Sequence, residues 1–168
     1  LKVMRGTGNM LEAPAMTHDE VLQGLETGIE AANMMIDKGV NLIAAGDMGI
    51  GNTTAATAII SVMTGIRVAE LTGRGTGVGD AGLKRKIETI ETALALHQVK
   101  KEEPLELLRC VGGLEIAAMT GFYLASAARR AALVLDGFIS HAAALIASSI
   151  NPNVKDYLFA SHTSHNPV

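Results

Sequence analysis

The fold is decided by residues 40–54, VNLIAAGDMGIGNTT, in which a short apolar run passes directly into a glycine-rich loop and then into small helix-forming residues. Residues 40–45 have the length and composition of a buried parallel strand. Apolar residues at 59–63 continue a helix that ends at Gly65. The stretch therefore predicts a strand, a glycine loop and a helix in direct succession.

The same alternation is predicted along the rest of the chain. Strands are expected at residues 40–45, 67–71, 132–135 and 157–160, and helices at residues 18–38, 53–64, 80–94, 104–108, 114–129 and 138–149. Thr17 and Glu20 form a capping-box signature before the first helix. The helix at 114–129 is apolar nearly all round, which indicates burial. Alternating strands and helices predict an α/β fold: a three-layer, mostly parallel, doubly wound sheet in a single domain over residues 1–168.

Each glycine-rich or polar cluster follows a predicted strand. Ligands of such sheets bind outside the carboxyl ends of the strands, so we expect the clusters to gather at one rim. Loop 46–54 presents backbone N–H groups at a helix N-terminus, which suits a phosphate or a carboxylate. It is not a Walker A loop, because no Gly-Lys-Ser/Thr follows, and its glycine order is not that of the dinucleotide fingerprint.

Asp47 is an unusual residue for a pure phosphate cradle. Its carboxylate would repel a phosphate, but it could orient a ribose hydroxyl or a nitrogen base. The alternative is a tight turn in which Asn52 or Thr53 caps the following helix.

The second loop, TGRGTGVG at residues 72–79, has glycines at every other position. Backbone without side chains lets a ligand approach closely and forms amide nests for anions. Arg74 and Lys86 could add positive charge, and the alternative is a flexible loop. Asp136 and Gly137 follow a predicted strand, where the acid could contact ribose hydroxyls or simply cap a helix.

Composition excludes several classes of partner. The chain has 14 basic and 17 acidic residues and a net charge of −3, which gives no reason to expect nucleic acid or an anionic membrane. The apolar zone at 116–150 is interrupted by charged residues, so no membrane helix is expected. Cys110 is the single cysteine and fits a small buried residue in a reducing compartment, and we predict a soluble, cytoplasmic protein. His162 and His165 lack a nearby cysteine or acid, so no metal is expected.

Five segments together resemble one enzyme family. They are residues 46–54 (GDMGIGNTT), 72–77 (TGRGTG), 112–121 (GGLEIAAMTG), 136–140 (DGFIS) and 161–162 (SH), in the family's order across essentially the whole chain. The family is that of the nicotinate-nucleotide:dimethylbenzimidazole phosphoribosyltransferases. The resemblance implies a parallel α/β fold, a homodimer, no metal and no cofactor.

The resemblance also implies a reaction and a set of site residues. Nicotinate mononucleotide and 5,6-dimethylbenzimidazole, or a related lower-ligand base, give α-ribazole 5′-phosphate and nicotinate, by displacement at ribose C1′ with inversion. Asp47 is the catalytic candidate within this chain. The implied substrate-binding residues are Met48, Gly49, Arg74, Gly75, Thr76, Gly77, Lys86, Asp136, Gly137 and Ser164. Among these, the segment from Gly75 to Gly77 and Lys86 are expected at the phosphate.

The sequence departs from the family pattern in two ways, and each departure leads to an expectation about function. The family usually has Glu where this chain has Asp47, and the shorter side chain could shift the preference for the base. The family is also roughly twice this length, with its main general-base glutamate in a C-terminal segment outside this chain. We therefore expect residues 1–168 to correspond to the central part of a longer enzyme and not to run the full reaction alone.

Other classes of protein remain open. The first is a non-catalytic domain that binds a nucleotide phosphate, or the partner subunit of a split enzyme. A dehydrogenase of the Rossmann type is disfavoured by the missing fingerprint. A purely structural scaffold is disfavoured by the glycine loops at strand ends.

Overall fold

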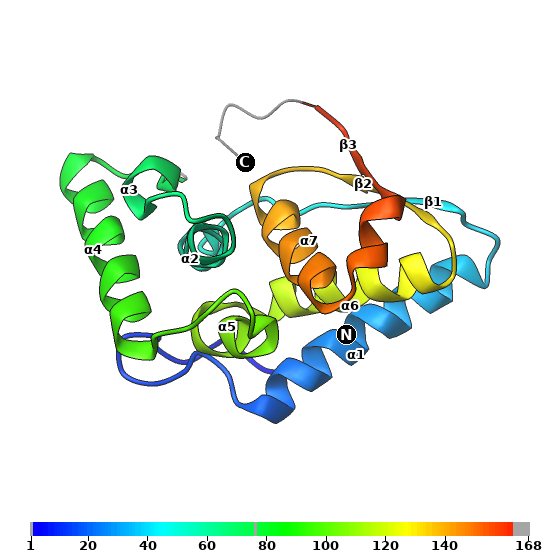
Figure 1. Ribbon diagram of the computed structural model, residues 1–168, viewed down its shortest axis with the longest axis horizontal. Coiled ribbons are helices and arrows are strands. Elements are labelled where there is room, and N and C mark those ends of the chain that lie inside the picture. The colour runs from blue at the N-terminus through cyan, green and yellow to red at the C-terminus, as the bar shows by residue number, and fades with distance from the viewer. Residues whose placement is uncertain (1, 76, 163–168) are drawn as a thin grey trace.

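The structure is a computed structural model that describes residues 2–75 and 77–162 (Figure 1). The elements are, in order, α1 (His18–Ile36), β1 (Leu42–Ala45), α2 (Thr53–Thr64), α3 (Val68–Leu71), α4 (Asp80–His97), α5 (Pro104–Val111), α6 (Leu114–Ala128), β2 (Ala132–Leu135), α7 (Phe138–Ile150), the 3₁₀ helix η1 (Pro152–Tyr157) and β3 (Leu158–Ala160). No helix in these described ranges is long and apolar enough to cross a membrane.

The three strands form a parallel sheet in the order β1-β2-β3, which confirms the predicted α/β class. Ile43 pairs with Leu133, and both are buried on the face that packs on helices. The opposite face leaves Leu42 and Phe159 largely exposed, at 61% and 53% of their surface. Within the described residues, the helices therefore cover one face of the sheet.

Helices α1 and α6 pack side by side because glycines remove the side chains between them (Figure 1). A Cβ atom on Gly28 would lie 1.8 Å from the carbonyl oxygen of Ala118, and one on Gly121 would lie 2.0 Å from that of Leu25. The predicted capping box starts α1: Thr17 Oγ1 accepts from the Glu20 amide at 3.2 Å, and Glu20 Oε2 accepts from the Thr17 amide at 2.8 Å. As predicted, α6 is buried over most of its length.

The strand predicted at residues 67–71 is wrong, because Val68–Leu71 form the short helix α3. The amide of Leu71 donates to the carbonyl of Arg67 and that of Thr72 to Val68, which is helical bonding. Arg67 pairs with Glu70 three residues later, an interaction that a helical turn favours. In a segment this short, burial of Val68 and Leu71 outweighs the weak strand preference of the sequence. The second glycine loop therefore follows a helix.

Smaller differences concern where helices begin. Aspartate is a residue that often caps helices, but at the start of α4 the N-cap is Gly79 and Asp80 is the first residue of the helix. Gly137 is the N-cap of α7, so Asp136 stands outside the helix at the end of β2 and does not act as the simple cap. Such one-residue shifts matter here because they decide which side chains face the rim of the sheet.

Candidate functional site

The loop after β1 is closed by its own acidic side chain. Asp47 Oδ1 accepts hydrogen bonds from the Gly49 amide at 2.7 Å and from Asn52 Nδ2 at 3.0 Å. Gly49 and Gly51 have φ angles of 71° and 82°, in the region that favours glycine. The glycines therefore let the loop turn sharply, and Asp47 holds the turn from within.

The carboxyl ends of β1 and β2 bring two acids to one rim. Ala45 pairs with Leu135, so the residues that follow them are neighbours. A Cβ atom on Gly46 would lie 2.8 Å from Asp136 Oδ2, which means that this carboxylate sits directly against the backbone of the first loop. Asp47 and Asp136 thus lie at the same edge of the sheet, as predicted for clusters that follow parallel strands.

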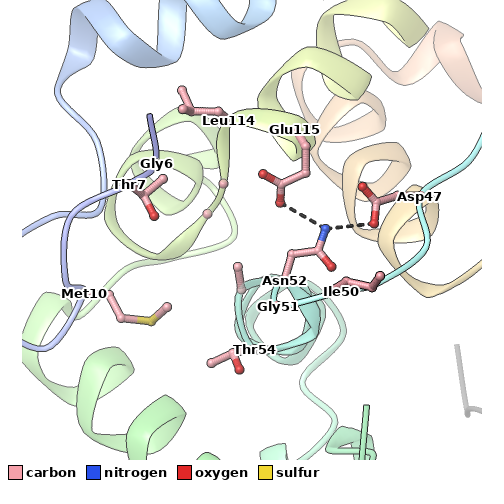
Figure 2. A pocket seen from close by; sticks show the side chains of 13 residues that line it. Gly6, Thr7, Met10, Asp47, Ile50, Gly51, Asn52, Thr54, Leu114 and Glu115 are labelled. Carbon is pink, nitrogen blue, oxygen red and sulfur yellow. Dashed lines mark hydrogen bonds between the residues drawn. The ribbon is translucent and has the colours of Figure 1, made fainter. Parts of the chain in front are cut away.

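A pocket of about 390 Å³ opens beside the first loop (Figure 2). Asp47 and Asn52 line one side, and Glu115 from the start of α6 lines the other. Asn52 Nδ2 donates to both carboxylates, at 3.0 Å to Asp47 and 3.3 Å to Glu115 Oε1. The pocket is therefore acidic on two sides, and it suits a ligand group that is cationic or donates hydrogen bonds.

A second pocket, of about 270 Å³, lies on the other side of the N-terminus of α2. It is lined by Thr53, Thr57, Gly73, Gly75 and Phe138 among others. Gly75 has a φ of 55°, and a Cβ atom there would lie 3.3 Å from Thr53 Oγ1. Glycine thus brings the second loop close to the first turn of α2.

Lys86 lies beside this second pocket, where it contacts two of the lining residues, and Arg74 is the cationic residue within the lining. Lys86 extends from α4, and its Nζ donates to Thr53 Oγ1 at 2.7 Å and to the carbonyl of Gly73 at 3.2 Å. Burial lowers the pKa of Lys86, because removing the ammonium group from water disfavours its charged form. A partly buried cation beside a helix N-terminus forms a strong site for an anion such as phosphate.

Arg74 lines the second pocket and also holds the second loop in shape. Its Nη1 donates to the carbonyl of Val78 at 3.0 Å, and its Nη2 pairs with the carboxylate of Asp80. The amides of Gly77 and Val78 donate to the Arg74 carbonyl, each at 3.0 Å. These internal bonds occupy the Gly77 amide, which the sequence predicts as an anion contact.

The structure places the other predicted site residues as follows. The Gly49 amide donates a hydrogen bond to Asp47, and the Gly137 amide donates one to Ser140 Oγ at 2.8 Å. Met48 is 87% exposed at the tip of the first loop, where an apolar side chain is free to contact a ligand. Thr76 and Ser164 lie outside the described residues. The structure therefore brings Asp47 and Asp136 to one edge of the sheet and places Lys86 at the first turn of α2.

The sequence does not predict a functional role for three residues that line or join the two pockets: Asn52, Thr53 and Glu115. The sequence suggests Asn52 and Thr53 only as helix caps, yet Asn52 links the two carboxylates and Thr53 contacts Lys86. Glu115 lies within the glycine motif at residues 112–121, but 63 positions separate it from Asn52. A single sequence holds no signal that would bring these positions together.

Cys110 lies outside the site and agrees with its expected role as a small buried residue. Burial raises the pKa of its thiol to about 11, and its Sγ donates to Glu106 Oε1 at 3.3 Å. The thiol is therefore protonated at neutral pH, which makes it a poor nucleophile.

Comparison with known proteins identifies relatives over the whole chain. A family model described as phosphoribosyltransferase matches residues 1–168. The nicotinate-nucleotide–dimethylbenzimidazole phosphoribosyltransferase of Clostridium acetobutylicum is 48% identical over 166 residues, and that of Chloroflexus aggregans is 52% identical over 163 residues. These matches cover 99% and 97% of this chain, and 47% and 46% of the relatives.

Solved structures agree with the sequence comparison. The crystal structure of CobT from Thermus thermophilus superimposes with a TM-score of 0.91 at 46% identity, covering 99% of this chain and 50% of that protein. The chain thus spans about half the length of the relatives it matches. On the family match over its full length, the chain belongs to the nicotinate-nucleotide–dimethylbenzimidazole phosphoribosyltransferase family.

Proposed function

We propose that this chain binds nicotinate mononucleotide and takes part in transferring its phosphoribosyl group to 5,6-dimethylbenzimidazole or a related base. The observation that carries the proposal is the contact of Lys86 with Thr53, which sets a partly buried cation at the first turn of α2. The names of the relatives supply the substrate class. The products would be α-ribazole 5′-phosphate and nicotinate.

The 5′-phosphate is assigned to the pocket of Lys86. Charge-assisted hydrogen bonds from an ammonium group to phosphate are stronger than neutral ones. The α2 N-terminus adds favourable partial charge, and Gly73 and Gly75 leave room for the phosphate oxygens. Arg74 contributes by holding the loop in shape.

The ribose and the pyridinium ring are assigned to the side of Asp47 and Asp136. When nicotinate is attached to ribose through its ring nitrogen, that nitrogen carries positive charge, which acids beside it stabilise, while the carboxylate of the ring points away from them in this assignment. In the transfer, the bond from C1′ to the nicotinate nitrogen breaks, and a bond from C1′ to a benzimidazole nitrogen forms on the opposite face. The benzimidazole N–H proton leaves to a base. Asp47 is the carboxylate within this chain that we assign to the reacting centre.

Calorimetric titration with nicotinate mononucleotide tests the donor site, with NAD as the control ligand. We expect micromolar to millimolar affinity for the mononucleotide and none for NAD. A Lys86→Ala variant should bind the mononucleotide about tenfold or more weakly while keeping the same melting temperature. Equal affinity for NAD, or no binding of either nucleotide by the folded chain, would overturn the assignment.

A second candidate function is non-catalytic binding of a nucleotide phosphate. The observation that favours it is the state of Asp47 Oδ1, which already accepts two hydrogen bonds within its own loop. Chromatographic detection of α-ribazole 5′-phosphate separates the two functions when the segments of the family that lie outside residues 1–168 are supplied in the assay. Product formation supports transfer, whereas nucleotide binding without product supports the binding role.

The expected homodimer and the cytoplasmic location stay predictions. Sedimentation of the purified chain would test the first, and fractionation of cells would test the second. The buried, protonated thiol of Cys110 is compatible with a reducing compartment.

A further inference from the structure

The glycine motif at residues 112–121 places the carboxylate of Glu115 beside the loop that carries Asp47. Glu115 is the second residue of α6, and its Oε1 accepts a hydrogen bond from Asn52 Nδ2 at 3.3 Å. The same nitrogen donates to Asp47 Oδ1 at 3.0 Å. Figure 2 shows Asn52 between the two carboxylates, which reach it from different elements.

The position of Glu115 depends on the glycine two residues before it. A Cβ atom on Gly113 would lie 2.4 Å from Glu115 Oε1 and 2.7 Å from Oε2, which is closer than real Cβ atoms come. Glycine therefore allows the carboxylate to fold back over the start of α6. The partial positive charge at a helix N-terminus stabilises a carboxylate there.

Asn52 links the two carboxylates, because its side-chain amide donates a hydrogen bond to each of them. Asparagine has two amide hydrogens, and here each has one carboxylate as its acceptor. Asn52 Oδ1 is buried and has no hydrogen-bond partner among residues 2–75 and 77–162. The orientation of the side chain is thus set by its two donor contacts, and losing one of them would free it to rotate.

We infer that Glu115 is a positioning residue: through the amide of Asn52 it fixes the Asp47 carboxylate and the loop that carries it. This inference rests on the proposed function, which assigns Asp47 to the nucleotide site. Glu115 acts by accepting a hydrogen bond and not by its charge. A neutral side chain of the same length that accepts a hydrogen bond should therefore replace it.

The test compares Glu115→Ala with Glu115→Gln, and uses Glu26→Ala on the exposed side of α1 as the control. In the ligand-free chain, NMR measures the chemical shift and the solvent exchange of the Gly49 amide, which donates to Asp47. Glu115→Ala should speed this exchange about fivefold, the factor expected for one lost hydrogen bond. Glu115→Gln and Glu26→Ala should stay within about twofold of the parent chain.

Nucleotide affinity supplies the second readout. Glu115→Ala should weaken binding of nicotinate mononucleotide about fivefold, and the effect should vanish in an Asp47→Ala background, because both residues act through one network. Melting temperatures confirm that each variant is folded. An unchanged Gly49 exchange rate in Glu115→Ala, or a Gln variant that behaves like Ala, would overturn the inference. If the parent chain binds no nucleotide, the proposed function fails while the exchange data still decide the role of Glu115.

Discussion

The two glycine-rich loops have similar composition but are built in opposite ways. The loop after β1 is closed by an acid, since Asp47 accepts from Gly49 and Asn52. The loop after α3 is closed by a base, since Arg74 donates to Val78 and pairs with Asp80. The first loop faces an acidic pocket, and the second lies beside Lys86.

The difference teaches that glycine spacing sets the shape of a loop and side chains set its ligand. Glycine permits the close approach in both loops, but it carries no charge. Lys86 and the N-terminus of α2 make the second pocket suitable for phosphate. The charge of Asp47 makes the first pocket suitable for a pyridinium nitrogen. A nucleotide with a phosphate at one end and a pyridinium at the other would match both pockets.

The largest expected effect comes from removing the cation of the second pocket. Lys86→Ala should weaken the affinity for nicotinate mononucleotide and for ribose 5-phosphate alike by about tenfold or more, because a hydrogen bond to a charged group is lost. Calorimetric titration measures both ligands. Lys84→Ala, on an exposed side chain of the same helix, is the matched control and should change neither. Similar losses in the two variants would mean that the effect is general electrostatics.

A pH series sharpens the assignment of the phosphate. Burial lowers the pKa of Lys86, so its charged form is lost at a less alkaline pH than that of a free lysine. Phosphate binds the charged form, and the affinity for ribose 5-phosphate should therefore fall as the pH rises through that lowered pKa. Lys86→Arg should remove this alkaline decline, because arginine stays protonated. An identical decline in the Arg variant would assign the titration to another group.

Asp47→Asn should have a smaller effect that is confined to one ligand. The Asn side chain can still accept from Gly49 and Asn52, so the loop keeps its shape while the charge is lost. We expect the affinity for nicotinate mononucleotide to fall about threefold to fivefold, in line with one exposed ion pair, and that for ribose 5-phosphate to stay constant. Parallel titrations with the two ligands check this. An equal loss for both would end the proposed division between the loops.

The smallest effect is expected for the ion pair that closes the second loop. The side chains of Arg74 and Asp80 are 53% and 91% exposed, so solvent screens their attraction. Asp80→Asn should leave the affinity for both ligands within about twofold of the parent value. A larger loss of phosphate binding would show that the pair, and not Lys86 alone, organises this pocket.

Local signals in the sequence predicted much of the fold. The capping box of Thr17 and Glu20 and the strand at residues 132–135 all occur as expected. Residues 67–71 could not be predicted, because so short a segment has no usable periodicity and its helical turn buries Val68 and Leu71 against the rest of the fold. Local chemistry decides caps and turns, whereas short segments depend on context.

The site was predictable only in part, because several of its contacts also depend on the packing of distant segments. Asp47 and Asp136 follow strands, and the topology of a parallel sheet brings such residues to one rim. Lys86 was predicted as a positive charge near the second loop and as a phosphate contact by its position in the family resemblance, since nothing in its helix marks it as a ligand. The contacts of Glu115 with Asn52 and of Lys86 with Thr53 join positions 63 and 33 residues apart, and only the packed structure shows them.

The division of the nucleotide between the two loops is tested most directly by an NMR titration of the backbone amides with nicotinate mononucleotide and, separately, with ribose 5-phosphate. We predict that ribose 5-phosphate shifts amides of the second loop and the first turn of α2, and that the mononucleotide shifts these and also the amides around Asp47 and Glu115. The same set of shifts for both ligands, or shifts confined to residues away from the two loops, would contradict this division.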